Sequence, residues 1–99
     1  MDYEKHGETV KIKLYRDFNY PNVKRIEKVL EDIDEGDLNT IFIDLTKSKI
    51  IDSEAVKFLF KLKKRGFNII LKNVPEIYYE VLEILELKDY FKDIKITYG

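Results

Sequence analysis

The order in which strand-like and helix-like patterns alternate constrains the fold of this chain more than any other feature. Thr9–Leu14 (TVKIKL) alternates apolar and polar residues, and Thr40–Leu45 (TIFIDL) is rich in residues that favour strands. A longer segment with the period of an amphipathic helix follows each of them. Asn68–Lys72 begins a third such pair, and Ile94–Tyr98 alternates again as a final strand. This order predicts one α/β domain over residues 1–99, with a largely parallel sheet of four to five strands.

The polarity of the strands predicts where the helices lie. Strands of a parallel sheet that is covered on both faces are apolar throughout. Here the first and last main strands carry polar residues at alternate positions, namely Lys11, Lys13, Lys95 and Thr97. We therefore expect the amphipathic helices chiefly on one face. Phe42 and Ile70 are expected on the thinner face, shielded by the N-terminal segment or by a dimer.

Turn and capping residues predict where the first elements begin and end. Met1–Lys5 is expected to form a short edge strand, with His6 and Gly7 as the turn after it. Pro21 is expected at the first position of the first helix, which would end near Gly36. The inward stripe of this helix is Val23, Ile26, Leu30 and Ile33.

A third amphipathic helix is expected after the turn Asn73-Val74-Pro75. Its apolar stripe would be Ile77, Val81, Leu82 and Leu85. Its outer side would carry Glu76, Glu80 and Glu83. Leu87–Asp93 is expected to be a short helical or irregular connection to the last strand.

The composition excludes several function classes. Lys plus Arg is 18 and Asp plus Glu is 19, so the chain lacks the basic excess that a nucleic-acid or anionic-membrane partner requires. No cysteine is present, which excludes disulfides and Cys-ligated metals. The N-terminus has no apolar signal-peptide core and no run approaches membrane-spanning length, so we expect a cytoplasmic protein. Abundant Ile, Lys and Glu without Cys, Gln or Trp is typical of heat-adapted, thermophile proteins.

The usual catalytic and cofactor patterns are missing. The four glycines are isolated, so no phosphate-binding loop is formed. His6 is the single histidine, and neither a His-based triad nor a His-rich metal site can be built. Asp44 and Asp52 bracket the loop after the Thr40–Leu45 strand and could pair as acid and base, but such carboxylates are more often solvated or capping. We expect no enzymatic activity, no catalytic residue, no metal and no cofactor.

The start of the second helix is the candidate functional site. Asp52 and Ser53 are both strong N-cap residues, and they directly precede Ala55 and Val56. Ser53 would lie beside free backbone N–H groups at the positive end of the helix dipole, a place that tolerates a phosphate well. Ser53 is therefore a candidate phosphorylation site. In the alternative interpretation, Ser53 or Asp52 only caps the helix.

The second helix carries more apolar surface than one sheet face needs. Its core stripe is Ala55, Phe58, Leu59 and Leu62, and Gly66 ends the helix. Val56 and Phe60 form a second stripe beside it, which either packs against a neighbouring helix or binds a partner. The candidate partner-binding residues are Asp52, Ser53, Glu54, Val56, Lys57, Phe60, Lys61 and Lys64.

The motifs around this helix resemble those of STAS domains, the fold of bacterial anti-sigma factor antagonists. The resemblance rests on an apolar strand that ends in Asp44-Leu45, the apolar pair Ile50-Ile51 and then Asp52-Ser53 before an apolar helix. Asn73-Val74-Pro75 is similar to the turn before the third helix of the family, and Leu85–Phe91 to its segment before the terminal strand.

The resemblance implies a regulatory function. In that family the serine after the Asp is phosphorylated by an anti-sigma kinase and dephosphorylated by a phosphatase. Only the unphosphorylated form binds the anti-sigma factor, and Ser53 occupies the serine position. The chain departs from the family at four positions: Glu54 replaces a second Ser or Thr, Ala55 replaces Gly, Asn19 replaces Asp, and Arg16 replaces Gly. Glu54 could partly imitate a phosphate, and Lys47 and Lys49 could offset its charge.

Two hypotheses follow for the function. In the first, a cytoplasmic STAS protein, monomer or weak homodimer, binds a protein partner through its second helix and releases it when Ser53 is phosphorylated. In the second, a non-phosphorylated scaffold or a small-ligand module that binds a nucleotide or anion has the same fold. Ser53 is then only a cap, and assembly uses Val56 and Phe60.

Overall fold

The computed structural model describes residues 1–33, 35–84 and 91–98 and is built on a five-stranded sheet in the order β1-β2-β3-β4-β5. The strands are β1 (Asp2–His6), β2 (Thr9–Lys13), β3 (Thr40–Asp44), β4 (Asn68–Val74) and β5 (Lys95–Tyr98). β1 pairs antiparallel with β2 through a turn at Gly7, whose φ is +60°, and the other three pairings are parallel. The sheet is therefore mixed, with a parallel block extended by an N-terminal edge strand.

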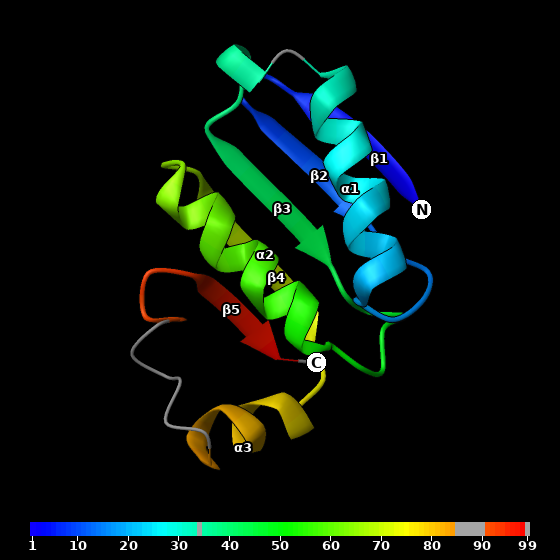
Figure 1. Cartoon of the computed structure of the whole chain (residues 1–99), viewed down its shortest axis with the longest axis vertical. Helices are drawn as coiled ribbons and strands as arrows, with labels where there is room; N and C mark the ends of the chain where they lie inside the picture. Colours follow the sequence, from blue (N-terminus) through cyan, green and yellow to red (C-terminus); the bar gives the residue numbers. More distant parts are fainter. Residues whose placement is uncertain (34, 85–90, 99) are drawn as a thin grey trace.

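The helices are α1 (Tyr20–Asp32), α2 (Ser53–Lys64) and α3 (Ile77–Ile84), with a 3-10 turn at Glu35–Asp37. Figure 1 shows that α1 and α2 lie side by side across one face of the sheet, whereas α3 lies beside the end of β5. The expectation that the helices lie chiefly on one face is confirmed for the described residues.

The core lies between this helix layer and the sheet. The strands contribute their alternate residues, of which Val10, Ile12, Ile41, Ile43, Ile69 and Leu71 are buried. The helices contribute the expected stripes, including Val23, Ile26, Leu30, Ala55, Phe58, Leu59 and Leu62. Local periodicity therefore places the right side chains inward on both layers.

The end of α1 was wrongly expected near Gly36. The helix ends at Asp32, and Ile33 takes an extended conformation with φ −94° and ψ 140°. This turn of the chain lets the Ile33 side chain pack against the core, while Gly36 lies in the following 3-10 turn. Gly66, in contrast, ends α2 as expected and has a φ of +91°.

The inward face of α3 also differs from the expectation. Ile77 is 62% exposed, whereas the neighbouring Tyr78 is half-buried and packs against the core. The hydroxyl of Tyr78 accepts a hydrogen bond from the backbone N–H of Ile51, which turns this position inward. The side chains of Val81 and Leu82, with Leu85 and most of the expected 87–93 connection, lie outside the described residues.

The N-terminal segment does not shield the face opposite α1 and α2. Its backbone pairs with β2 and extends the sheet sideways, because an unpaired strand edge offers free N–H and C=O groups. Phe42 and Ile70 lie on this opposite face, as expected, and both are half-buried.

Candidate functional site

Two loops that precede helices lie together at the carboxyl end of the parallel strands. The loop before α1 and the loop before α2 are joined by backbone hydrogen bonds, from Phe18 N–H to the Ile50 carbonyl (2.9 Å) and from Asp52 N–H to the Phe18 carbonyl (3.0 Å). Phe18 is fully buried and forms an isolated parallel bridge with Ile51. This pairing holds the N-termini of α1 and α2 next to each other.

Asp17 stabilises the second loop from the first. Its carboxylate accepts hydrogen bonds from the backbone N–H groups of Lys49 (2.8 Å) and Ile50 (3.1 Å). The buried hydroxyl of Ser48 donates to the carbonyl of Arg16 (2.6 Å). The loop that leads to Ser53 is therefore held by side chains from both loops.

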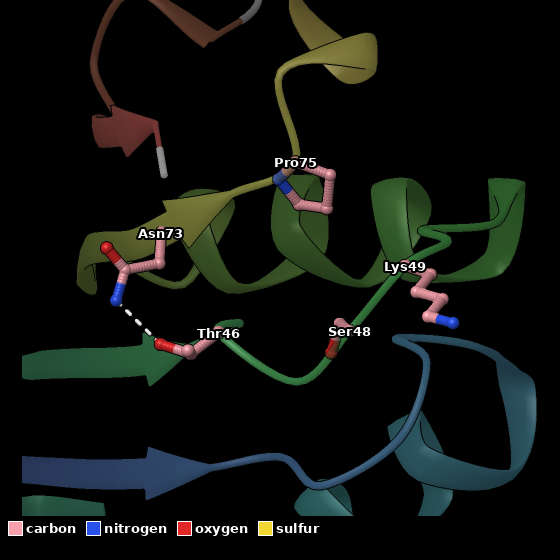
Figure 2. Close-up of a pocket in the computed structure, with 5 residues that line it drawn as sticks. All are labelled: Thr46, Ser48, Lys49, Asn73 and Pro75. Atoms are coloured by element: carbon pink, nitrogen blue, oxygen red, sulfur yellow. Dashed lines mark hydrogen bonds between the residues drawn. The ribbon is translucent and has the colours of Figure 1, made fainter.

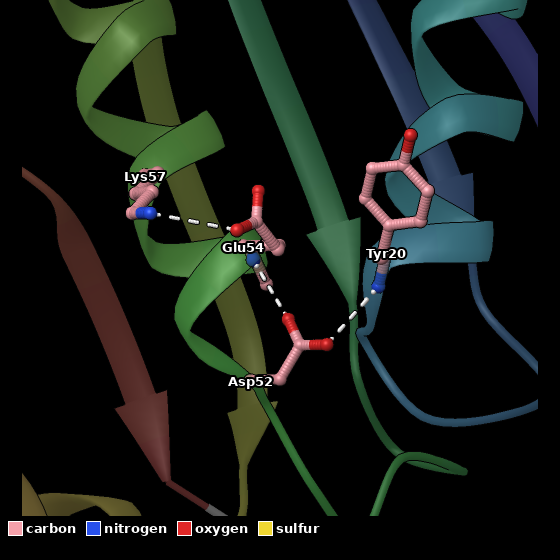
Figure 3. A network of polar contacts seen from close by, with 5 residues as sticks. Tyr20, Asp52, Glu54 and Lys57 are labelled. Carbon is pink, nitrogen blue, oxygen red and sulfur yellow. Dashed lines mark hydrogen bonds and ion pairs between the residues drawn. The ribbon is translucent and has the colours of Figure 1, made fainter.

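The Asp52 carboxylate accepts hydrogen bonds from the first turns of both helices, although the N-cap of α1 is Asn19. One oxygen accepts from the N–H of Ala55 (2.9 Å) at the start of α2, and the other accepts from the N–H of Tyr20 (3.1 Å) at the start of α1. Figure 3 shows the carboxylate between these two donors. Asp52 is thus the N-cap of α2, and Ser53 is the first residue of the helix, with an exposed side chain.

The two neighbouring helix N-termini make the surface around Ser53 favourable for negative charge. Glu54 forms an ion pair with Lys57 one turn along α2, at 3.5 Å (Figure 3). The side chains of Lys57 and Glu54 are 72% and 46% exposed, so this pair contributes little to stability. Its effect is to place a positive charge beside the carboxylate that follows Ser53.

Tyr78 closes the other side of the loop. Its hydroxyl accepts from Ile51 N–H, the residue before the Asp52 cap. Burial raises the pKa of Tyr78, the hydrogen bond from Ile51 opposes this effect, and the nearby charges of Asp52 and Asp17 raise the pKa further. Through this contact α3 is connected directly to the start of α2.

A polar network joins the ends of three strands beside this loop. The hydroxyl of Thr46 donates to the carboxylate of Asp44 (2.5 Å) and accepts from the side-chain amide of Asn73 (2.6 Å). The backbone N–H of Asn73 donates to the hydroxyl oxygen of Thr97 (3.2 Å). Asn73 has a φ of +59°, a conformation that asparagine tolerates better than most residues. Partial burial opposes ionisation of Asp44, but hydrogen bonds from Thr46 and Asn73 and the charge of Lys13 outweigh it and lower its pKa.

An open hollow of about 490 Å³ lies at this edge of the sheet. Its lining residues are Thr46, Ser48, Lys49, Asn73 and Pro75. Figure 2 shows the hydrogen bond between Thr46 and Asn73, while the Lys49 side chain points away from that pair. Among the lining residues, the single cation, Lys49, is therefore not directed at the Thr46–Asn73 pair.

The remaining candidate residues on α2 divide into two groups. Lys57, Lys61 and Lys64 are exposed on the outer side. Val56 and Phe60 are half-buried and pack against the core, and the Phe60 ring lies 5.2 Å from that of Phe91. The second apolar stripe thus faces the molecule's own segment before β5.

Two exposed apolar residues beside Ser53 were not among the candidate partner-binding residues, although Ile50 belongs to the apolar pair Ile50-Ile51 of the family motif. Ile50 is 56% exposed in the loop before α2, and Tyr20 is 51% exposed at the start of α1. Asp17 and Tyr78 were missed too, because each acts on residues 27 to 33 positions away in the chain. Only the fold brings these side chains to the site.

Within the described ranges, no group of three or more acidic or histidine side chains could hold a metal ion. None of the helices seen there is long and apolar enough to cross a membrane.

The mixed sheet with helices on one face, and a helix α2 that begins with an Asp cap followed by an exposed serine, define a class of α/β domains. The STAS domain model matches residues 1–98, so the chain belongs to the STAS family. No curated protein shows significant sequence similarity to the chain.

Solved structures support the same fold. The chain is 22% identical to a candidate anti-sigma factor antagonist of Thermotoga maritima, TM1081, with a TM-score of 0.72 over 99% of this chain and 85% of that one. It is 21% identical to the anti-sigma factor antagonist SpoIIAA in its unphosphorylated form, with a TM-score of 0.69 over 99% of this chain and 87% of that one. At these identities the similarity establishes the fold.

Proposed function

We propose that this chain is a regulatory protein-binding module that acts as an anti-sigma factor antagonist, controlled by phosphorylation of Ser53. The observation that carries the proposal is that different residues cap α2 and present a hydroxyl at its start. Asp52 caps the helix, so the exposed hydroxyl of Ser53 is left available to a kinase. The structural similarity to SpoIIAA, whose structure was described in its unphosphorylated form, supports a switch of this kind.

The surface around Ser53 suits a protein partner. Ile50 and Tyr20 are exposed apolar side chains on either side of the Asp52 cap, and such side chains are typical anchors of an interface. The outer side of α2 carries three exposed basic side chains, those of Lys57, Lys61 and Lys64. We infer that the partner presents an apolar pocket with acidic residues at its rim.

Phosphorylation of Ser53 would weaken the binding of this partner electrostatically. A phosphoserine adds about −1.5 to −2 charges. Between Asp52 and Glu54, it would place a concentrated negative patch inside the proposed contact area. Repulsion by the acidic rim of the partner and the cost of burying the phosphate would release the partner without refolding of the domain.

The modification is tested by intact-mass analysis of the protein from its native host, with peptide mapping across residues 49–57 and a phosphatase-treated control. Phosphate on Ser53 is the expected result. Its absence under several growth conditions would contradict control by phosphorylation.

The switch is tested with binding of the host's anti-sigma factor kinase to purified variants. Ser53→Ala should bind as tightly as the unmodified chain, and Ser53→Asp should bind at least tenfold more weakly. Ile50→Ala, which leaves Ser53 unchanged, should also weaken binding if Ile50 is an anchor. Equal binding by the alanine and aspartate variants would rule out the switch.

The hollow at the strand ends favours a second candidate function, a small-ligand module. The Thr46 hydroxyl and one N–H of the Asn73 amide donate within the network, so of these two side chains the second amide N–H of Asn73 would donate to an anionic or nucleotide ligand. Titration with inorganic phosphate and with a nucleotide, followed at the amide signals of residues 46–49 and 73, tests this function. Val56 and Phe60 pack inward, so we do not propose assembly through them.

A further inference from the structure

The face of the sheet opposite α1 and α2 carries an ordered pattern of charges. The strand register places Asp2, Lys13, Asp44 and Lys72 side by side across four strands at one level. Their charges alternate in sign along this row. The next row consists of Glu4, Lys11, Phe42, Ile70 and Lys95.

The centre of this face is apolar. Phe42 on β3 and Ile70 on β4 are register partners, and both are half-buried even though no described helix covers them. The ammonium of Lys11 lies 5.6 Å from the centre of the Phe42 ring. A shallow groove of about 450 Å³ runs along the β1 to β3 side of this face.

We propose that this open face binds a second copy of the chain, sheet against sheet, with β3 of each copy over β4 of the other. The two copies are related by a twofold axis that is parallel to the strands and lies between β3 and β4. Two sheets that pack face to face with aligned strands are a common arrangement in proteins.

The charges on β3 and β4 fit this arrangement. The twofold axis exchanges the two strands, so every register pair between them becomes a pair between copies. Asp44 then faces Lys72 of the second copy, and Lys72 faces Asp44 of the second copy. Phe42 likewise faces Ile70 of the second copy, and the polar pair Thr40 and Asn68 meets in the same way.

Two symmetry-related pairs of like charges accompany these contacts. Lys11 would face Lys95 of the second copy near the rim, and Lys95 would face Lys11 of the second copy, where all of these side chains are exposed. Long lysine side chains at a rim reach solvent, so their repulsion is weak compared with the central contacts.

The size of the face predicts a weak association. With the axis between β3 and β4, the four strands β2 to β5 of each copy overlap, and β1 extends beyond them. Four strands about 4.8 Å apart, with five residues of about 3.3 Å each, cover roughly 320 Å² per copy. Two copies would bury roughly 640 Å², below the roughly 1,200 Å² of stable interfaces and in the range of weak and transient complexes. The dimer is therefore expected at high protein concentration, and phosphorylation on the helix side should not control it.

The experiment is analytical ultracentrifugation of the full chain from about 10 µM to about 1 mM, a range chosen for a weak complex. A concentration-dependent shift from monomer to dimer is expected. Lys72→Asp and Asp44→Lys should each raise the dissociation constant at least tenfold, because each creates two like-charge contacts. An equimolar mixture of the two variants should dimerise, since both central pairs then join opposite charges.

Two further variants keep the test decisive. Phe42→Lys leaves the polar network around Asp44 intact and should also abolish the dimer, whereas Lys64→Asp on α2 should have no effect. A monomer over the whole range would overturn the proposal. So would a dimer that is indifferent to Phe42→Lys and Lys72→Asp, because it would use another surface.

Discussion

At the residue scale, one carboxylate organises the candidate site. Asp52 accepts hydrogen bonds from the first turns of α1 and α2, and this leaves Ser53 free of a structural role. In many helices a serine at the start would do the capping itself. The separation of roles lets Ser53 be modified without loss of the helix cap.

This separation predicts unequal stability losses. Asp52→Ala removes the cap of α2, about 1 kcal/mol, and the acceptor of the Tyr20 N–H, about 1 kcal/mol, and should lower the free energy of unfolding by about 2 kcal/mol. Ser53→Ala, at an exposed position, should change it by less than about 0.5 kcal/mol. Urea denaturation measures both values, and Asp52→Asn serves as the control that keeps an acceptor. Equal losses for the two alanine variants would contradict the assignment of the cap.

Tyr78 predicts a dependence of stability on alkaline pH. Its pKa is raised above the ordinary value of 10.0 in the folded chain, so the folded state holds this proton more tightly than the unfolded state. The stability that Tyr78 contributes is therefore complete below pH 10 and is lost as the pH rises through the folded pKa. In Tyr78→Phe this part of the alkaline loss of stability should disappear. The free energy of unfolding at neutral pH should fall by about 1 kcal/mol, because the hydrogen bond from Ile51 N–H is lost. An unchanged alkaline profile, measured by denaturation between pH 8 and pH 11, would argue against this role.

At the element scale, α2 packs on two sides. One stripe meets the sheet, and Val56 and Phe60 meet the segment around Phe91. The sequence pattern left open whether this second stripe packs internally or binds a partner, because a flanking apolar stripe looks the same in both cases. Because it packs against Phe91, Phe60 lies at the edge of the hydrophobic core.

Phe60 should therefore matter for stability. A fully buried Phe→Ala change costs about 3–5 kcal/mol, so the half-buried Phe60→Ala is expected to cost about 1–2 kcal/mol. Lys61→Ala, next to it on the exposed side, is the matched control and should stay within about 0.5 kcal/mol. A loss in partner binding by folded Phe60→Ala, with stability unchanged, would instead favour the partner-binding interpretation.

At the scale of the whole molecule, the two proposed surfaces lie on opposite sides. Ser53 is at the start of a helix on one face of the sheet, and Phe42 and Ile70 lie on the other face. No rearrangement is needed for one surface to work while the other is occupied. The protein could bind a partner and a second copy at the same time.

This arrangement predicts that the two properties are independent. Ser53→Asp should leave the self-association constant within about twofold of the unmodified chain, a difference of about 0.4 kcal/mol. It should also preserve the circular dichroism spectrum and the unfolding midpoint, because Ser53 is exposed and is not the cap. Sedimentation at matched concentrations makes the comparison, and a dimer that dissociates in Ser53→Asp would show that the surfaces are coupled.

The sequence by itself determined the elements and the sides that they bury. Alternation in β2 and β3 and the stripes of α1 and α2 depend on local geometry, which repeats every two residues in a strand and every 3.6 in a helix. The family motif around Asp52 and Ser53 could be recognised for the same reason, since its residues are adjacent in the chain. Sequence patterns predicted the ends of elements less well. The end of α1 was expected near Gly36 and Ile77 on the buried side of α3, and both expectations were wrong because tertiary packing determined these positions.

Only the tertiary structure decided which residues meet at the site. Asp17 reaches Lys49 and Ile50, Asp52 reaches Tyr20, and Tyr78 reaches Ile51 across 27 to 33 positions of sequence. No local pattern marks such partners, because a side-chain oxygen can accept from any donor that the fold brings near. The choice of Asp52 as the cap and the open face around Phe42 likewise follow from how the loops and layers pack.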